Sequence, residues 1–327
     1  MHSLARSFFS AAVLLAGATG LPPAPPSTVL AADNSPVTTV QKSGTESTLM
    51  GVHFRDAKIG WAVGAGGTIL KTADGGRRWK ARSSGTNAIL AGVFFSDAHR
   101  GWVVGSSGTI LHSKDGGEKW TSQGSGTQAP LYGVYFLTPA VGWAVGGGGT
   151  ILQTVDGGAT WSDITSGTNA ALYAVHFLDQ QQGLAVGALG IILLTQDGGR
   201  TWTPQETRSA ATFFDVRYAD PLNAWAVGNA GAMFQTADGG LTWADRTLPC
   251  TQRCSRLTDL LRVRFTDAKA GWVVGERGTI YRTTDAGITW VEVPNGVKAS
   301  LYGLTFPDGA FGWATGERGT IIHITSQ

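Results

Sequence analysis

The chain has 327 residues, of which 47 are glycine, 12 are tryptophan and only 2 are cysteine. A hydrophobic fraction of 42% excludes a disordered chain, and two cysteines exclude a disulfide-dense scaffold. The 25 Lys and Arg residues nearly balance the 23 Asp and Glu residues, so the formal net charge of +2 gives no general electrostatic argument for nucleic-acid binding.

Residues 1–32 are predicted to be a secretory signal peptide and a proline-rich spacer. Arg6 precedes a short apolar run, FFSAAVLLAGA at 8–18, and small residues follow it. The run is too short to cross a bilayer of about 30 Å as a helix. The alternative, an apolar helix packed into the fold, fits the flanking residues less well. We therefore predict an exported protein that does not span a membrane, with its folded domain at 33–327.

Two short motifs recur in phase along the rest of the chain. The first is GWAVG or a close variant, repeated at 41 residues with one spacing of 47, and its second positions are Trp61, Trp102, Trp143, Leu184, Trp225, Trp272 and Trp313. The second motif, Ser/Thr-x-Asp-x-Gly-x-x-Trp, is an Asp-box, and its aspartates are Asp74, Asp115, Asp156, Asp197, Asp238 and Asp285. All 12 Trp residues fall in these two motifs, which indicates repeat packing rather than ligand stacking.

Each repeat is predicted to form four short strands, which in the first repeat are 52–54, 61–63, 68–72 and 79–82. These segments are β-branched or aromatic and are bounded by Gly, Asp, Asn or Ser. Four strands in a period of about 40–45 residues are typical of a propeller blade. The seven copies therefore predict an all-β, seven-bladed β-propeller of four-stranded antiparallel blades.

The two chain ends are predicted to share the last blade. The seventh repeat stops after its third strand, at 323–327, and Ser43-Gly44-Thr45 stands 41 residues before the equivalent Ser84-Gly85-Thr86. The segment 37–41 is thus in the register of a fourth strand. Pairing it with the last blade would remove an exposed sheet edge.

The Asp-box aspartates have a structural and a functional interpretation. A turn aspartate commonly accepts backbone N–H hydrogen bonds, whereas six equivalent carboxylates around a rim cannot converge on one substrate or metal. Asp-box propellers include glycoside hydrolases, most of which need two carboxyl groups flanking the scissile bond. No insertion here places a Glu beside a Tyr as sialidases do, and the six histidines are scattered over different repeats. We therefore predict structural Asp-boxes and no enzymatic activity, metal or cofactor.

The one long spacing carries an insertion at about 248–258. It holds Cys250 and Cys254, the only cysteines, which in an exported protein indicate a disulfide more readily than a metal site. Two free thiols are the alternative. The insertion also carries Arg253 and Arg256.

A basic sector is predicted around the sixth and seventh repeats. Their turns read GERGTI, with Arg277 and Arg318, where the earlier turns are neutral, and these turns should share a face with Arg253 and Arg256. Arg262 and Arg264 lie on the predicted innermost strand of the sixth repeat, near the channel mouth. Arginine suits carboxylate contacts at protein interfaces. The alternative is a solvated surface neutralised by Glu276 and Glu317.

Taken together, GWAVG, GTIL and the Asp-box in this order resemble the exported single-propeller photosystem II stability/assembly factors, over about 37–327. The resemblance implies a non-enzymatic seven-bladed propeller that binds a photosystem II reaction-centre protein, partly through an arginine patch. Candidates for that patch are Arg253, Arg256, Arg262, Arg264, Arg277 and Arg318. The location would be the periplasm, or the thylakoid lumen in a photosynthetic host.

The sequence therefore predicts a monomeric, protein-binding assembly or stability factor. Two alternatives stay open at this point. The chain could be a periplasmic scaffold of an envelope complex in a bacterium without photosystem II. It could also be a carbohydrate-binding or degenerate hydrolase propeller, which would need paired carboxylates and stacked aromatics at the channel.

Overall fold

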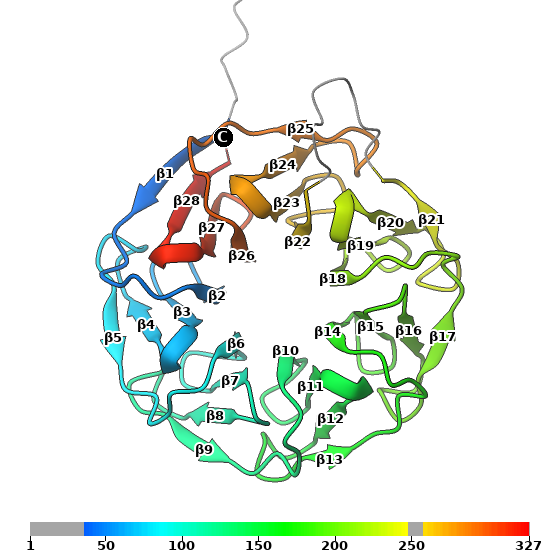
Figure 1. The fold of residues 1–327 in the computed structure, drawn as a ribbon, viewed down its shortest axis with the longest axis horizontal. Helices are drawn as coiled ribbons and strands as arrows, with labels where there is room; N and C mark the ends of the chain where they lie inside the picture. The colour runs from blue at the N-terminus through cyan, green and yellow to red at the C-terminus, as the bar shows by residue number, and fades with distance from the viewer. Residues whose placement is uncertain (1–35, 248–257, 327) are drawn as a thin grey trace, which may run out of the picture. The chain divides into compact units, whose positions relative to one another are not determined.

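The computed structural model describes residues 36–247 and 258–326. The predicted signal peptide, the spacer and Cys250, Arg253, Cys254 and Arg256 lie outside these residues. The described residues form seven four-stranded antiparallel sheets arranged in a ring (Figure 1). The predicted seven-bladed propeller is confirmed.

Each sheet runs from the centre of the ring to its rim (Figure 1). The innermost strands are β2 (Leu49–Phe54), β6 (Leu90–Phe95), β10 (Leu131–Phe136), β14 (Leu172–Phe177), β18 (Phe213–Tyr218), β22 (Leu260–Phe265) and β26 (Leu301–Thr305). The second strands are β3 (Gly60–Gly64), β7 (Gly101–Gly105), β11 (Gly142–Gly146), β15 (Gly183–Gly187), β19 (Ala224–Gly228), β23 (Gly271–Gly275) and β27 (Phe311–Gly316). The third strands are β4 (Ile69–Thr72), β8 (Ile110–Ser113), β12 (Ile151–Thr154), β16 (Ile192–Thr195), β20 (Met233–Thr236), β24 (Ile280–Thr283) and β28 (Ile321–Thr325). The outer strands are β5 (Lys80–Arg82), β9 (Thr121–Gln123), β13 (Ser162–Asp163), β17 (Thr203–Gln205), β21 (Ala244–Asp245), β25 (Val291–Glu292) and β1 (Val37–Gln41).

The outer strand of the seventh blade comes from the start of the propeller domain. β1 pairs antiparallel with β28, from Val37 opposite Thr325 to Gln41 opposite Ile321. This confirms the predicted closure, in which the two ends of the domain are hydrogen-bonded to each other in one sheet.

The GWAVG strands are buried because both of their faces are covered by neighbouring blades. All five residues of β3 are buried, and Trp61 is 0% exposed. The Trp61 ring stacks on Phe95 of the next blade at 3.5 Å between ring centroids, and its Nε1 donates to the carbonyl oxygen of Gly116 at 3.1 Å. Trp102 and Trp313 make the equivalent hydrogen bonds to Gly157 and Gly75, so these three tryptophans join two blades both by packing and by a hydrogen bond, whereas Nε1 of Trp143 has no partner among the described residues.

Leu184 replaces this tryptophan in the fourth blade, and other side chains make the missing hydrogen bond. The Gln182 amide Nε2 donates to the carbonyl oxygen of Gly239 in the next Asp-box at 2.6 Å, and the Tyr218 hydroxyl donates to the same oxygen at 3.3 Å. The contact between blades is thus kept with different residues.

The turn between the second and third strands of a blade packs against the segment that leads from that blade to the next. In the first blade the turn η1 (Ala65–Gly67) places Gly67 at φ +70, where a Cβ would lie 1.9 Å from the carbonyl oxygen of Thr86. Gly67 also donates its N–H to the carbonyl oxygen of Ala88 at 2.8 Å. This contact agrees with the prediction that both segments open on the same face.

The six Asp-box carboxylates hold their own turns. In every box Oδ1 accepts the backbone N–H of the residue four positions later at 2.9 Å, and the Ser or Thr two positions earlier donates its hydroxyl to the same oxygen. These hydrogen bonds are the ones that the structural interpretation of the boxes requires.

In the part of the chain that is described, no helix is long and apolar enough to cross a membrane.

Candidate functional site: one wall of the central channel

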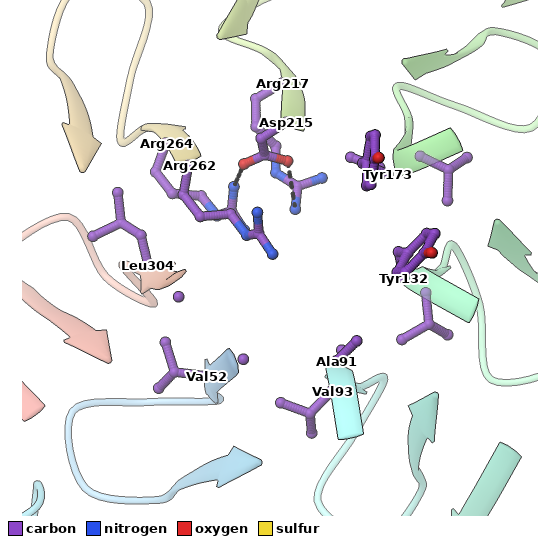
Figure 2. A pocket seen from close by; sticks show the side chains of 17 residues that line it. Val52, Ala91, Val93, Tyr132, Tyr173, Asp215, Arg217, Arg262, Arg264 and Leu304 are labelled. Atoms are coloured by element: carbon purple, nitrogen blue, oxygen red, sulfur yellow. Dashed lines mark hydrogen bonds and ion pairs between the residues drawn. The ribbon is translucent and has the colours of Figure 1, made fainter. Parts of the chain in front are cut away.

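The channel is lined by the innermost strands, and two of them depart from the repeat. At the third position of these strands five blades have Gly or Ala, but β18 has Asp215 and β22 has Arg262. At the fifth position the same two strands have Arg217 and Arg264, where the others have His, Phe, Tyr or Thr. These four residues, here called the channel cluster, line one cavity (Figure 2).

Asp215 holds the cluster together and joins the fifth blade to the sixth. Its side chain is 2% exposed. Its Oδ2 accepts the Arg264 Nη1–H at 2.5 Å and the backbone N–H of Val263 at 3.1 Å, while Oδ1 lies 3.8 Å from Nη2 of Arg217. The carboxylate is therefore anchored to both the backbone and the side chains of the neighbouring blade.

The three guanidinium groups are only partly satisfied by the protein. Arg264 Nη1 also donates to the carbonyl oxygen of Val263 at 2.6 Å, and Arg262 Nη1 donates to that of Leu261 at 2.7 Å. Nη1 of Arg217 is buried without a hydrogen-bond partner among the described residues. Because an arginine carries five N–H donors, the cluster keeps donors that a ligand could use.

The cluster carries more positive than negative charge. Burial alone would raise the pKa of Asp215, but Arg264, Arg217 and Arg262 hold it at about 2. Burial, followed by the charge of Arg264, lowers the pKa of Arg217 to about 10. Asp215 and Arg217 are therefore ionised at neutral pH, and because guanidinium groups remain protonated in proteins, three positive charges face one negative charge. A surplus of enclosed charge is costly unless a counter-charge approaches it.

Two histidines on the channel strands do not add to this positive charge. Burial first, and then Arg264 and Arg217, lowers the pKa of His53 to about 4. Burial and the same two arginines hold the pKa of His176 well below its usual value. Both rings are neutral at physiological pH.

The rest of the channel wall is apolar or aromatic. Val52 and Val93 line the cavity across from the cluster, and Leu304 lines it beside Arg262 and Arg264 (Figure 2). Tyr132 and Tyr173 lie on adjacent blades with ring centroids 5.1 Å apart. The channel therefore combines a cationic wall with aliphatic and aromatic walls.

The structure brings together only part of the predicted arginine set. Arg262 and Arg264 meet in the channel, as the prediction of their position near its mouth requires. Arg277 and Arg318 lie in the turns η4 (Glu276–Gly278) and η5 (Glu317–Gly319), outside the residues that line the channel cavity. Arg318 instead borders a surface groove beside Lys42 and Glu46.

The two turn arginines have an unusual backbone conformation. Arg277 and Arg318 have φ of +55 and +52, at the position where η1 has Gly66. Side chains other than glycine are uncommon there and carry some strain. Glu317 accepts hydrogen bonds from the Ser300 N–H at 3.1 Å and from the Tyr302 hydroxyl at 3.2 Å.

Sequence reasoning missed Asp215 and Arg217 as site residues. When the seven innermost strands are aligned, Arg217 occupies the position of His53, and Asp215 occupies a position that is Gly or Ala in five of the strands. Comparing the aligned strands position by position could have found both residues. Within 36–247 and 258–326, no group of three His, Cys, Asp or Glu residues could hold a metal ion.

Several solved propellers have the same fold. "YCF48 bound to D1 peptide" matches with a TM-score of 0.74 at 20% identity over 90% of this chain and 96% of that one. YCF48 from Cyanidioschyzon merolae matches with a TM-score of 0.72 at 23% identity over 88% and 98%. A GH74 xyloglucanase from Xanthomonas campestris matches with a TM-score of 0.70 at 12% identity, over 87% of this chain and 53% of the enzyme. These likenesses show the fold.

A search of curated proteins finds no sequence relative of this chain. The family model described as photosynthesis system II assembly factor YCF48 matches residues 31–130, 123–204, 201–294 and 250–325, which together cover nearly the whole propeller. The match agrees with the resemblance in the repeat motifs. The chain belongs to the YCF48 family of photosystem II assembly factors.

Proposed function

We propose that this propeller is an exported, non-enzymatic assembly factor that binds an extended acidic segment of a protein client. The surplus of positive charge in the channel cluster is the observation that carries the proposal. The channel wall thus presents partly desolvated arginines, and arginine is among the residues that contribute most of the binding energy at many protein interfaces. A related YCF48 protein has been solved with a D1 peptide, which favours a photosystem II reaction-centre subunit as the client.

The lining of the channel favours binding over hydrolysis. Asp215 is the one carboxylate among the lining residues described, and it is held by arginines and by the Val263 N–H. Most glycoside hydrolases need a pair of carboxyl groups. Although this chain shares its fold with a GH74 enzyme, the described residues that line its channel cavity do not include the pair of carboxyl groups that such hydrolysis requires.

The remaining assignments extend the same proposal. Arg277 and Arg318, together with Arg253 and Arg256 of the insertion, would enlarge the basic surface that the client meets. A Cys250–Cys254 disulfide would stiffen the insertion. Signal-peptide cleavage would deliver a monomeric propeller to the periplasm, or to the thylakoid lumen of a photosynthetic host.

The test is the affinity of the purified propeller for a synthetic D1 peptide, measured by fluorescence anisotropy. Arg262→Gln/Arg264→Gln should weaken binding at least tenfold, because buried charge-assisted contacts are worth more than exposed ones. Arg277→Gln/Arg318→Gln should weaken it less. Lys80→Gln/Arg78→Gln, on the outer wall of the first blade, is the matched control and should leave binding unchanged. Equal losses in all three double variants would show nonspecific charge attraction and contradict the proposal.

A further inference from the structure

The channel cluster has the composition of a receptor for one small anion. Its three guanidinium groups and single carboxylate leave a charge surplus of two, and Asp215 already uses both oxygens within the cluster. We propose that the channel binds a single carboxylate group between Arg217, Arg262 and Arg264, with Asp215 as the positioning residue. This inference rests on the proposed function for the source of the carboxylate, which is the client.

The free donors are what the ligand would engage. Nη1 of Arg217 is buried and without a partner among the described atoms, although the Arg217 side chain is 19% exposed and lines the cavity. A carboxylate in the cavity would offset part of the surplus charge, and it would reach Nη1 once the partly exposed Arg217 side chain turns toward it. The planar guanidinium fork also suits two-point contact with a carboxylate.

The size of the cavity limits the ligand to a small group. Its free volume of about 60 Å³ holds a few non-hydrogen atoms but no folded element. A chain end or one acidic side chain therefore enters, while the rest of the client stays outside the channel.

The apolar wall across the cavity favours a carboxylate over phosphate. Val52 and Val93 on that wall, and Leu304 beside the arginines, offer no hydrogen bonds from their side chains. A phosphate would direct oxygen atoms toward these aliphatic groups and lose their hydration without replacement. A carboxylate directs its carbon to that wall and its two oxygens to the arginines. The ligand that fits both walls is anionic on one side and hydrocarbon on the other.

Two sources of carboxylate share this chemistry, a C-terminal carboxylate and an Asp or Glu side chain. The probes that separate them are N-acetyl-leucine, with a chain-end carboxylate, and N-acetyl-glutamic acid α-amide, with a side-chain carboxylate only. N-acetyl-leucinamide is the uncharged control. Binding is followed by chemical shifts of the backbone N–H groups of Gly92, Gly133 and Gly303, which line the cavity.

At least one of the two carboxylate probes should shift these signals, and the tighter one identifies the source. N-acetyl-leucinamide should shift none of them. Arg217→Gln should weaken binding at least tenfold, and Arg217→Lys should give an intermediate loss because it keeps the charge without the fork. Arg78→Gln, an exposed arginine whose side chain is 85% accessible, should have no effect. Unchanged thermal unfolding of each variant establishes that it is folded.

Two results would overturn the proposal. One is no shift with either carboxylate probe. The other is equal or tighter binding of chloride or inorganic phosphate at matched ionic strength, which would make the cluster a general anion site. If the probes fail while the D1 peptide still binds through Arg277 and Arg318, the assembly function survives and the carboxylate receptor does not.

Discussion

The blade framework outside the channel, here called the shell, repeats the same residues from blade to blade, whereas one wall of the channel does not. In the shell, the tryptophans, the turns and the Asp-boxes recur from blade to blade, and even Leu184 is compensated so that the contact between blades is kept. In the channel, the fifth and sixth blades replace small or aromatic residues with Asp215, Arg217, Arg262 and Arg264. The shell residues stabilise the ring, whereas the channel residues bring unsatisfied charge into it. Function is best sought where the repeat is broken.

We expect the largest loss of stability from removing a tryptophan that packs between two blades. Trp102 is 0% exposed, stacks on Phe136 at 3.6 Å and donates to the carbonyl oxygen of Gly157 at 3.1 Å. Trp102→Ala should lower the free energy of unfolding by about 3–5 kcal/mol, because it leaves a large cavity. Urea denaturation measures this change. If the cost stays below about 1 kcal/mol, these tryptophans do not hold the blades together.

Removing the anchor of the channel cluster should cost nearly as much. Asp215→Asn leaves three arginines without their counter-charge, and breaking a buried ion pair from one side costs about 3 kcal/mol or more. Added acetate should restore part of the loss in this variant, and it should do less for Trp102→Ala. Thermal unfolding with and without acetate, at constant ionic strength, distinguishes the two. An Asp215→Asn variant as stable as the wild type would mean that the cluster is hydrated and unstrained.

The channel histidine His53 predicts a pH dependence of the stability of the fold. The pKa of His53 is lowered from 6.5 to about 4 in the folded state. The unfolded chain therefore binds this proton first, so stability is complete above about pH 6.5 and falls as the pH drops to about 4. The shift corresponds to about 3 kcal/mol. His53→Phe, which copies Phe94 of the next blade, should reduce the slope of the stability profile between pH 6.5 and 4, and the lowered pKa values of other histidines account for the slope that remains. An unchanged slope would show that His53 is not the titrating group.

The smallest expected effect is at a single Asp-box. Asp197 accepts the Thr201 N–H at 2.9 Å and the Thr195 hydroxyl at 2.9 Å in a turn on the rim. Asp197→Ala should cost about 1 kcal/mol, the net worth of a few hydrogen bonds near solvent, and should leave binding of the D1 peptide intact. Asp163→Ala, on an exposed outer strand, is the matched control. Loss of binding with normal folding would contradict a purely structural role.

The same contrast explains what the sequence could predict. The 41-residue spacing and the shared Ser-Gly-Thr triplets predict the blades, their number and the pairing of β1 with β28, because each blade repeats one local pattern. The channel cluster depends on which side chains of neighbouring blades point at one another, and no local motif records that. Arg262 and Arg264 were found because they follow a basic insertion. Asp215 and Arg217 lie in a repeat of ordinary length, so no insertion marks them, and only an alignment of the innermost strands or their contacts with the next blade distinguishes them.

If the channel wall of the fifth and sixth blades receives a carboxylate of the client, a crystal structure of the propeller with the bound D1 peptide will show it. We expect a carboxylate of the peptide with its oxygens within about 3.2 Å of guanidinium nitrogens of Arg217, Arg262 or Arg264. A peptide bound entirely on another surface, with no acidic group in the channel, would contradict it.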